Sequence, residues 1–215
     1  IETIIAGTTN LTVNGNTTMR GDHTSTGTFT VNGGTLRVEG STAADLNLKG
    51  GSFVVETPMV LTQGQDVTFN GGNMVGSLET ANGSTLKISA SSSISEDLTL
   101  NGGTVTPGGS GISLKIGGDL IILGNTTIDV NAYVDEGTYV LMSATSISDN
   151  LDLLTAVTDT RNENTLDVSG SSLVLKVKEN PATLAWNAGT EGIWSTQSEQ
   201  EWLVVDGGTN PNPDP

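Results

Sequence analysis

The chain has 215 residues, a formal net charge of −16 and no cysteine, which excludes disulfide-stabilised folds and thiolate chemistry. The negative charge argues against nucleic acid or an anionic membrane surface as a partner. Glycine is abundant, with 28 residues, whereas the chain has only three Phe, two Tyr and three Trp. This composition suits many tight turns better than a broad globular core. No apolar run is long enough to insert into a membrane as a helix.

Short segments with the pattern apolar–polar–apolar recur along the first 130 residues, and this pattern is typical of half-buried β-strands. Most of them are followed by a Gly-Gly pair and, two residues later, by another apolar residue. "FTVNGGTLRVEG" at 29–40 and "LNLKGGSFVVET" at 46–57 are two copies. The pairs lie at 33–34, 50–51, 71–72, 102–103 and 117–118.

Repeated units of roughly 15–21 residues bury a core by stacking on their neighbours. The sequence therefore predicts an all-β protein, a right-handed parallel β-helix with an atypical β-rich C-terminal cap. An antiparallel sandwich is the rival fold, but it does not require Gly-Gly at equivalent places. The apolar residues after the pairs are expected to stack on one another inside the solenoid, and the asparagines before the corners are expected to form one ladder. The apolar residues are Leu36, Phe53, Met74, Val105 and Leu120, and the asparagines are Asn14, Asn32, Asn70 and Asn101.

The repeat pattern changes near residue 125. We expect β-helix coils over 1–130, and over 131–180 a β-rich cap that protects the open end of the solenoid. The segment 181–215 carries three tryptophans and ends in a Pro/Asn-rich linker, "GGTNPNPDP".

Two stretches near the C-terminus carry a family resemblance. "EGTYVLMSATSISDN" at 136–150 with "TLDVSGSSLVLKV" at 165–177 resembles the closing segment of bacterial autotransporter-type passenger domains. The upstream coils are similar to the Gly-rich strand repeats of the same surface β-helices. The resemblance implies an extracellular or bacterial cell-surface location, outer-membrane association through a missing part, and adhesion or display. It does not imply enzymatic activity.

Arg20-Gly21-Asp22 forms the tripeptide that integrins recognise, within a stretch at 16–27 that is expected to be a protruding loop without a packing role. The alternative for these three residues is a solvated loop without a partner, because three-letter motifs also occur by chance. The adjacent His23 is the only histidine, so a histidine pair for a metal is excluded.

No group of residues suggests catalysis. Glu39 and Glu56 take the same place in two aligned coils, and Arg37 and Lys49 are near enough in sequence to neutralise them, so a solvated polar ladder is favoured over an acid/base pair. Polysaccharide lyases and hydrolases of this fold need clustered acids with a base, and the acids here are scattered. We predict no catalytic residues, no metal site and no cofactor.

Trp186, Trp194 and Trp202 are spaced by eight residues, which indicates a cap or small core, or alternatively a platform for sugar rings. The sequence thus predicts a non-enzymatic secreted or cell-surface module that displays loops from a rigid solenoid. The expected partner is a host-cell receptor or a glycan. The alternative is a glycan-binding or carbohydrate-active β-helix fragment.

Overall fold

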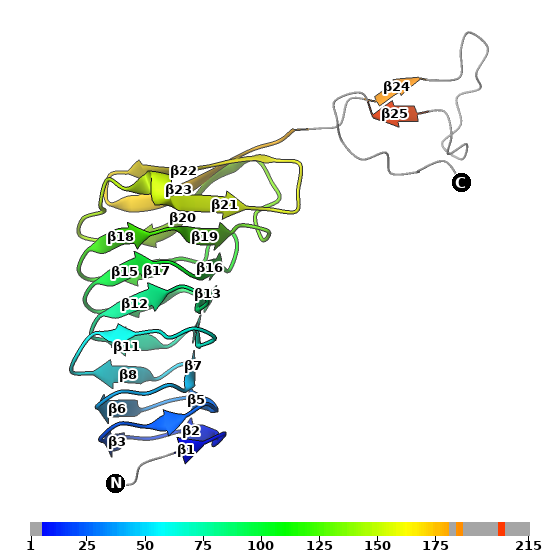
Figure 1. The fold of residues 1–215 in the computed structure, drawn as a ribbon. Helices are drawn as coiled ribbons and strands as arrows, with labels where there is room; N and C mark the ends of the chain where they lie inside the picture. Colours follow the sequence, from blue (N-terminus) through cyan, green and yellow to red (C-terminus); the bar gives the residue numbers. More distant parts are fainter. Residues whose placement is uncertain (1–5, 181–183, 187–201, 205–215) are drawn as a thin grey trace.

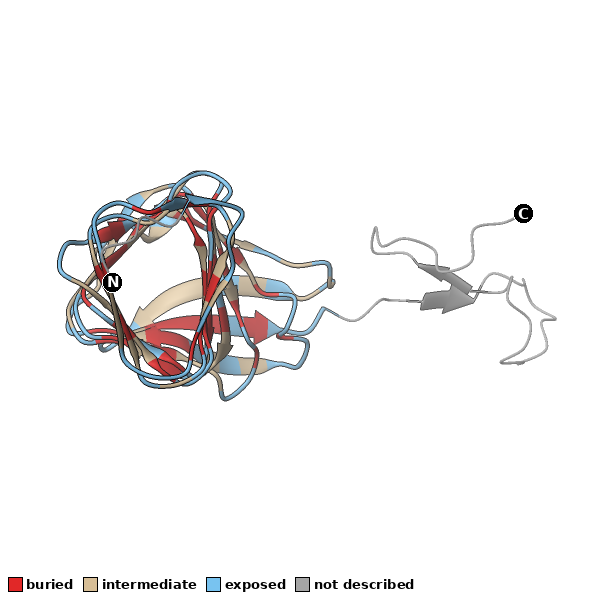
Figure 2. Cartoon of the chain, turned by 90° about the horizontal axis from the view of Figure 1, so that it is seen from below, coloured by how far each residue is buried: buried red, intermediate tan, exposed pale blue. Residues whose placement is uncertain are grey.

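The chain winds into a parallel β-solenoid of about six turns. The computed structural model describes residues 6–180, 184–186 and 202–204, and nearly all of their regular structure is β-strand. The coils stack into a rod (Figure 1), and along its axis they superimpose as one closed outline (Figure 2). The predicted all-β parallel solenoid is therefore confirmed.

Successive coils contribute strands to three stacked sheets in turn. Sheet 1 is entirely parallel and contains β2 (Leu11–Val13), β5 (Thr28–Val31), β7 (Asp45–Leu48), β10 (Asp66–Asn70), β13 (Thr85–Ala90), β16 (Thr104–Pro107), β19 (Thr126–Asp129) and β21 (Leu154–Val157). Sheet 2 contains β3 (Thr17–Arg20), β6 (Thr35–Glu39), β8 (Ser52–Val55), β11 (Asn73–Val75), β14 (Ser92–Ile94), β17 (Leu114–Ile116), β20 (Gly137–Ser143), β23 (Ser172–Lys178) and β22 (Glu163–Ser169).

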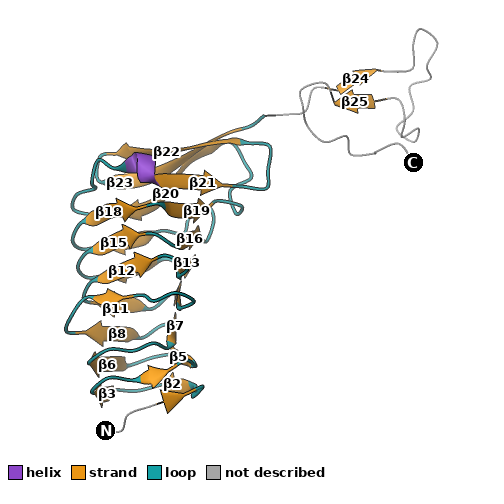
Figure 3. Cartoon of the chain, viewed as in Figure 1, coloured by secondary structure: helices purple, strands orange, loops and turns teal. Residues whose placement is uncertain are grey.

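Sheet 3 is shorter and contains β9 (Met59–Val60), β12 (Leu78–Ala81), β15 (Leu98–Asn101) and β18 (Leu120–Gly124). Below it, on the same side of the coils, β1 (Ala6–Gly7) pairs with β4 (Thr24–Ser25). Away from the solenoid sheets, β24 (Leu184–Trp186) pairs with β25 (Trp202–Val204). Among the described residues η1 (Leu151–Leu153) is the only helical element (Figure 3).

Alternation along each strand builds the core. In β5 and β10, for example, Phe29, Val31, Val67 and Phe69 are fully buried while the residues between them face outward. Each such side chain contributes about 1.5–3 kcal/mol by leaving water. The strands are short, so the stability of the fold comes from stacking many coils on one another.

The five apolar residues that follow the Gly-Gly pairs are all fully buried, as predicted, but they do not form one column. Leu36, Phe53 and Met74 stack directly in sheet 2. Val105 instead stacks between Leu86 and Ile128 in sheet 1, and Leu120 on Leu98 in sheet 3. The prediction of a common column is wrong because Gly-Gly occurs at all three corners of the coil.

Close approach between coils explains the second glycine of these pairs. A Cβ on Gly34 would lie 2.5 Å from the carbonyl carbon of Gly15, and one on Gly51 would lie 2.8 Å from the carbonyl oxygen of Gly34. Gly34 also has a φ of 68°, which disfavours any larger residue. Gly51 has no positive φ, so there the glycine is required by space alone.

The predicted asparagine ladder is only partly present. Asn32 Nδ2 donates to Asn14 Oδ1 over 3.0 Å, in adjacent coils. The next coil places Lys49 in this column, since Leu48 stacks between Val31 and Phe69. Asn101 lies at the end of a sheet 3 strand, where it donates to Glu79 Oε1 over 2.8 Å. A ladder of four asparagines is therefore wrong, again because the corners are not equivalent.

The third side of the rod has a break between its second and third coils. The bridge between His23 and Thr42 lies below the break, and the edge of β9 lies above it. The buried side chain of Gln65 spans it, since Gln65 Nε2 donates to the carbonyl oxygens of Thr42 (3.3 Å) and Ala44 (2.8 Å). A side-chain amide thus substitutes for backbone hydrogen bonds where the third side of the coil lengthens.

The C-terminal end of the rod is closed differently from its body. β20 still pairs in parallel with β17, and β21 with β19, so the coiling continues to Val157. The hairpin β22–β23 then adds to β20 in the antiparallel direction, and Leu173, Leu175 and Val177 of β23 join the core. Residues 131–180, which the sequence assigns to a cap, therefore contain one more coil followed by this hairpin.

Candidate functional site

The tripeptide Arg20-Gly21-Asp22 lies at a corner of the first complete coil. Arg20 ends β3 and its guanidinium pairs with Glu39 of the next coil at 2.9 Å. Gly21 turns the chain with a φ of 82°. Asp22 Oδ1 accepts hydrogen bonds from the backbone N–H (2.9 Å) and the hydroxyl (2.8 Å) of Ser41. All three residues are exposed, but both charged side chains are engaged by the coil above.

The surrounding stretch is not a protruding loop. Within 16–27, β3 and β4 are strands, and His23 and Ser25 are buried in the interior. The expectation of a loop without a packing role is therefore wrong. The packing role of this stretch could not be predicted from its apolar residues, because a histidine and a serine occupy the core positions here. Burial lowers the pKa of His23, and the neighbouring Asp22 raises it by a smaller amount.

The contact with Ser41 gives Asp22 a testable pH dependence. The backbone and side-chain hydrogen bonds from Ser41 lower the pKa of Asp22 below its ordinary value of 3.8. Because the carboxyl group of Asp22 has a lower pKa in the folded chain than in the unfolded chain, its ionised form stabilises the fold at pH values above the unfolded-state pKa. This stabilisation is lost as the pH falls through the folded-state pKa. We expect the melting temperature of the parent to fall more steeply below about pH 4 than that of Asp22→Asn, whose amide still accepts hydrogen bonds but does not titrate. Circular-dichroism melts of both proteins measure this difference, and parallel pH curves would contradict it.

Glu39 and Glu56 lie in one column of sheet 2, since Val38 stacks on Val55. Arg37 bridges them, with Nε 3.3 Å from Glu39 and Nη2 hydrogen-bonded to Glu56. The carboxylate of Glu56 is the main reason that the pKa of Arg37 is raised. This is the neutralisation predicted from Arg37, and it supports the interpretation as a solvated polar ladder.

Many other acidic and amide side chains serve as connections between coils. An oxygen of an Asp or Asn at a corner accepts the backbone N–H of the residue in the next coil. Such contacts join Asn10 to Thr28, Asp22 to Ser41, Asp45 to Asp66, Asp97 to Asp119 and Asn131 to Asp159. The acids are thereby spread along the rod, and the described residues contain no group of three or more His, Asp or Glu that could hold a metal ion.

A small pocket of about 70 Å³ opens at the break on the third side, lined by residues 40–42, 55 and 57–60. Its lining is uncharged. Its walls are the corner after β6 and the segment that joins β8 to β9. No titratable group lines it, so the pocket lining holds no acid/base pair to activate the hydroxyls of Ser41, Thr42 and Thr57.

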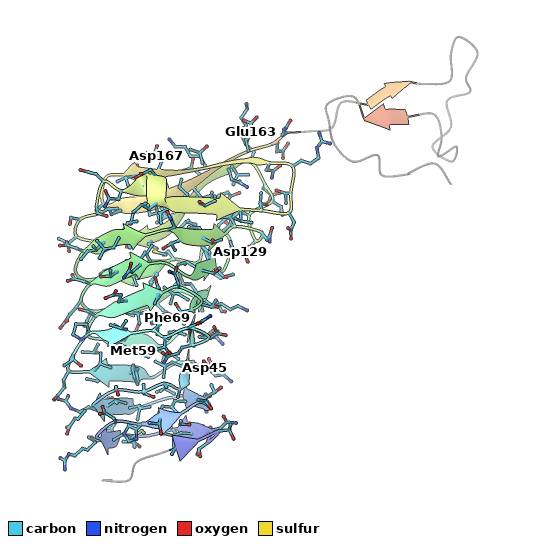
Figure 4. All side chains as sticks on the ribbon, viewed as in Figure 1. Asp45, Met59, Phe69, Asp129, Glu163 and Asp167 are labelled. Carbon is cyan, nitrogen blue, oxygen red and sulfur yellow. The ribbon has the colours of Figure 1, made fainter. Side chains whose placement is uncertain are left out.

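The outward side of sheet 1 carries two continuous columns of mostly polar residues, and we call it the threonine face. Two columns of outward residues run along it, one through Thr12, Thr30, Asn47, Thr68, Lys87 and Thr106, and the other through Thr28, Asp45, Asp66, Thr85, Thr104, Thr127 and Thr155. Asp129 of β19 follows Thr106 in the first column. Figure 4 labels Asp45 and Asp129, two charged members of this face, at separate levels of the stack.

The hydroxyls of the nine threonines on this face make no hydrogen bond within the described part of the chain. Elsewhere threonine hydroxyls are used internally, as in Thr80 to Gly102 O (2.8 Å) and Thr145 to Gly117 O (2.9 Å). Sequence reasoning missed this face, although the pattern Thr-x-Thr at 28–30 and 104–106 was visible. The signal becomes clear only once the register shows which threonines lie side by side.

The structure describes two of the three tryptophans, and only by their backbone. Trp186 of β24 and Trp202 of β25 are antiparallel partners. Trp194 and the linker at 207–215 lie outside the described residues. The choice between a packed cap and a sugar platform therefore stays a prediction.

Comparison with known proteins found no matching family model, no matching curated protein and no matching solved structure. Within the described residues, no helix has the length and apolar character required to cross a membrane. What the protein does must therefore be inferred from its own surfaces.

Proposed function

We propose that this chain is a non-enzymatic structural and adhesive module at a cell surface or outside the cell, which binds through the outer faces of a rigid solenoid. One observation carries the proposal. Several charged groups, among them Asp22, Arg37 and Asp97, are committed to inter-coil contacts, whereas the threonine face leaves a regular array of hydroxyls without internal partners. A catalytic site needs the opposite arrangement, with reactive groups gathered in a cleft.

The solenoid is rigid enough to display its outer faces because each coil is bonded to the next. Backbone hydrogen bonds, carboxylate-to-amide contacts at corners and the Arg37 bridge all join one coil to the next. A host-cell receptor or a glycan is the expected partner. The competing function is a glycan-binding or carbohydrate-active fragment, in which the paired strands of Trp186 and Trp202 would form the sugar platform.

Two measurements on the whole chain separate these functions. The first is attachment of host cells, and binding to a glycan array, with the chain immobilised. The second is incubation with a polysaccharide panel, read by release of reducing ends or of unsaturated sugars. We expect binding without cleavage. Cleavage would assign the chain to the carbohydrate-active class, and absence of any binding would remove the adhesive role.

The contribution of Arg20-Gly21-Asp22 has its own test. Because Asp22 is held by Ser41 and Arg20 pairs with Glu39, we expect integrin-bearing cells to attach equally well to the parent and to Asp22→Glu. Asp97→Glu is the matched control, since Asp97 accepts the backbone N–H of Asp119 in the same way and does not follow Arg-Gly. Selective loss of attachment in Asp22→Glu would instead assign receptor binding to the tripeptide.

A further inference from the structure

The nine threonines of the threonine face exceed what strand formation alone requires. Threonine favours any solvated strand, so propensity by itself predicts similar numbers on every side of the rod. In sheet 3 the corresponding outward column contains Val60, Glu79, Thr99 and Ile121, with a single threonine. The concentration of threonine on sheet 1 therefore points to a ligand for that face.

The face forms a two-dimensional net. Adjacent parallel strands lie about 4.8 Å apart, and alternate residues along a strand about 6.6 Å apart. The strands of sheet 1 pair residue for residue between Thr12 and Thr68 and between Thr85 and Thr155. The one register shift in this sheet follows Phe69 and lies outside both columns. Since β-branched side chains have restricted χ1, the net places methyl and hydroxyl groups at fixed, repeated positions.

We propose that the threonine face binds the surface of ice. The inference rests on the proposed role of the solenoid as a module that binds through its outer faces, and it identifies the ligand of this face. Ice and liquid water offer the same hydrogen-bonding groups, so a protein selects the solid only by matching its order. A rigid net of hydroxyls meets that requirement. Transfer of the threonine methyl groups out of liquid water makes a further favourable contribution to the free energy of binding.

The composition of the face favours ice over a polysaccharide. Sugar rings stack on aromatic side chains, and the described outward positions of sheet 1 hold no Phe, Tyr or Trp. The run from Thr85 to Thr155 is also uncharged, in a chain of net charge −16. An uncharged run of threonines without aromatics suits ordered water better than a glycan or a charged partner.

Charged residues divide the net and identify where it is best formed. Asp45 and Asp66 lie in the lower half of one column, and Lys87 and Asp129 interrupt the other. Because charges hold their own hydration shells, they disrupt an ice-like water layer. The longest unbroken run is Thr85, Thr104, Thr127 and Thr155, each stacked on the next. We assign the strongest ice contact to this run.

The test is growth of a single ice front through a dilute solution of the whole chain, with protein measured in the ice and in the liquid. We expect the parent to be enriched in the ice several-fold over serum albumin. The double variant Thr104→Lys/Thr127→Lys is expected to be excluded like albumin. Thr99→Lys, the same substitution on an outward strand position of sheet 3, is the matched control and should retain parental enrichment.

A gain-of-function variant keeps the test independent of folding losses. Lys87→Thr extends the net between Thr68 and Thr106 and should increase partition into ice. Circular dichroism verifies that every variant is folded. Exclusion of the folded parent from ice would overturn the proposal, as would binding to cellulose or chitin that the double variant abolishes, because this would identify a polysaccharide as the ligand. Neither result would affect attachment of cells, which tests the adhesive function separately.

Discussion

Phe53→Asp is expected to destabilise the solenoid by several kcal/mol, because it buries a carboxylate without a partner. Phe53 is fully buried and stacks between Leu36 and Met74 in sheet 2. The substitution removes the contacts of an aromatic ring in three successive coils and places a charge among apolar side chains. Urea unfolding followed by circular dichroism measures the change.

Val54→Asp is the matched control, one residue along the same strand. Val54 faces outward and stacks on Arg37 of the coil below, so a carboxylate there stays solvated beside a positive charge. We expect its stability to remain within about 0.5 kcal/mol of the parent. Equal unfolding curves for Phe53→Asp and Val54→Asp would show that the inward and outward faces of β8 are assigned incorrectly.

Gly34→Ala is expected to cost about 2–4 kcal/mol, because it adds strain at positive φ to an overlap between two backbones. The φ of Gly34 is 68°. Its Cβ would approach three backbone atoms of Gly15 at 2.5, 2.6 and 2.7 Å, and backbone atoms cannot move aside as a flexible side chain would. Chemical denaturation measures the loss of stability.

Gly15→Ala tests the same corner without the overlap. A Cβ on Gly15 meets nothing within 4 Å, and its φ is not positive. We expect this variant to match the parent or to gain slightly, since alanine restricts the unfolded chain. If both alanine variants were equally stable, close approach between coils would not be the reason for the Gly-Gly pairs.

The prediction of the fold from sequence succeeded because one physical constraint repeats. Leu46 and Leu48, or Val67 and Phe69, show the alternation of a strand with one buried face, and glycine marks each turn. The sequence could not show which corner a given pair occupies, since all three corners require a compact turn between closely packed coils. Val105 and Leu120 were therefore assigned to the wrong column although their burial was predicted correctly.

The candidate site was harder to predict because it depends on register. The tripeptide at 20–22 was visible as a motif, but its contacts with Glu39 and Ser41 come from the coil above. His23 has a polar side chain, yet the coil directs it inward. The threonines of the threonine face are separated by intervals of up to 38 residues in the sequence, and only the stacking of sheet 1 makes neighbours of them.

Among the described residues, the five contacts in which an Asp or Asn side chain accepts a backbone N–H of another coil all have the same polarity. In each, the side chain belongs to the earlier coil and accepts the amide of the later one, as from Asp97 to Asp119. A finished coil therefore offers the incoming chain acceptors that are already in place, and its open strand edge guides the next winding. Assembly can then advance from the N-terminus as a template-directed process, one coil at a time. Each new coil closes only a short loop. The loss of chain entropy on folding is therefore divided into small steps along the rod.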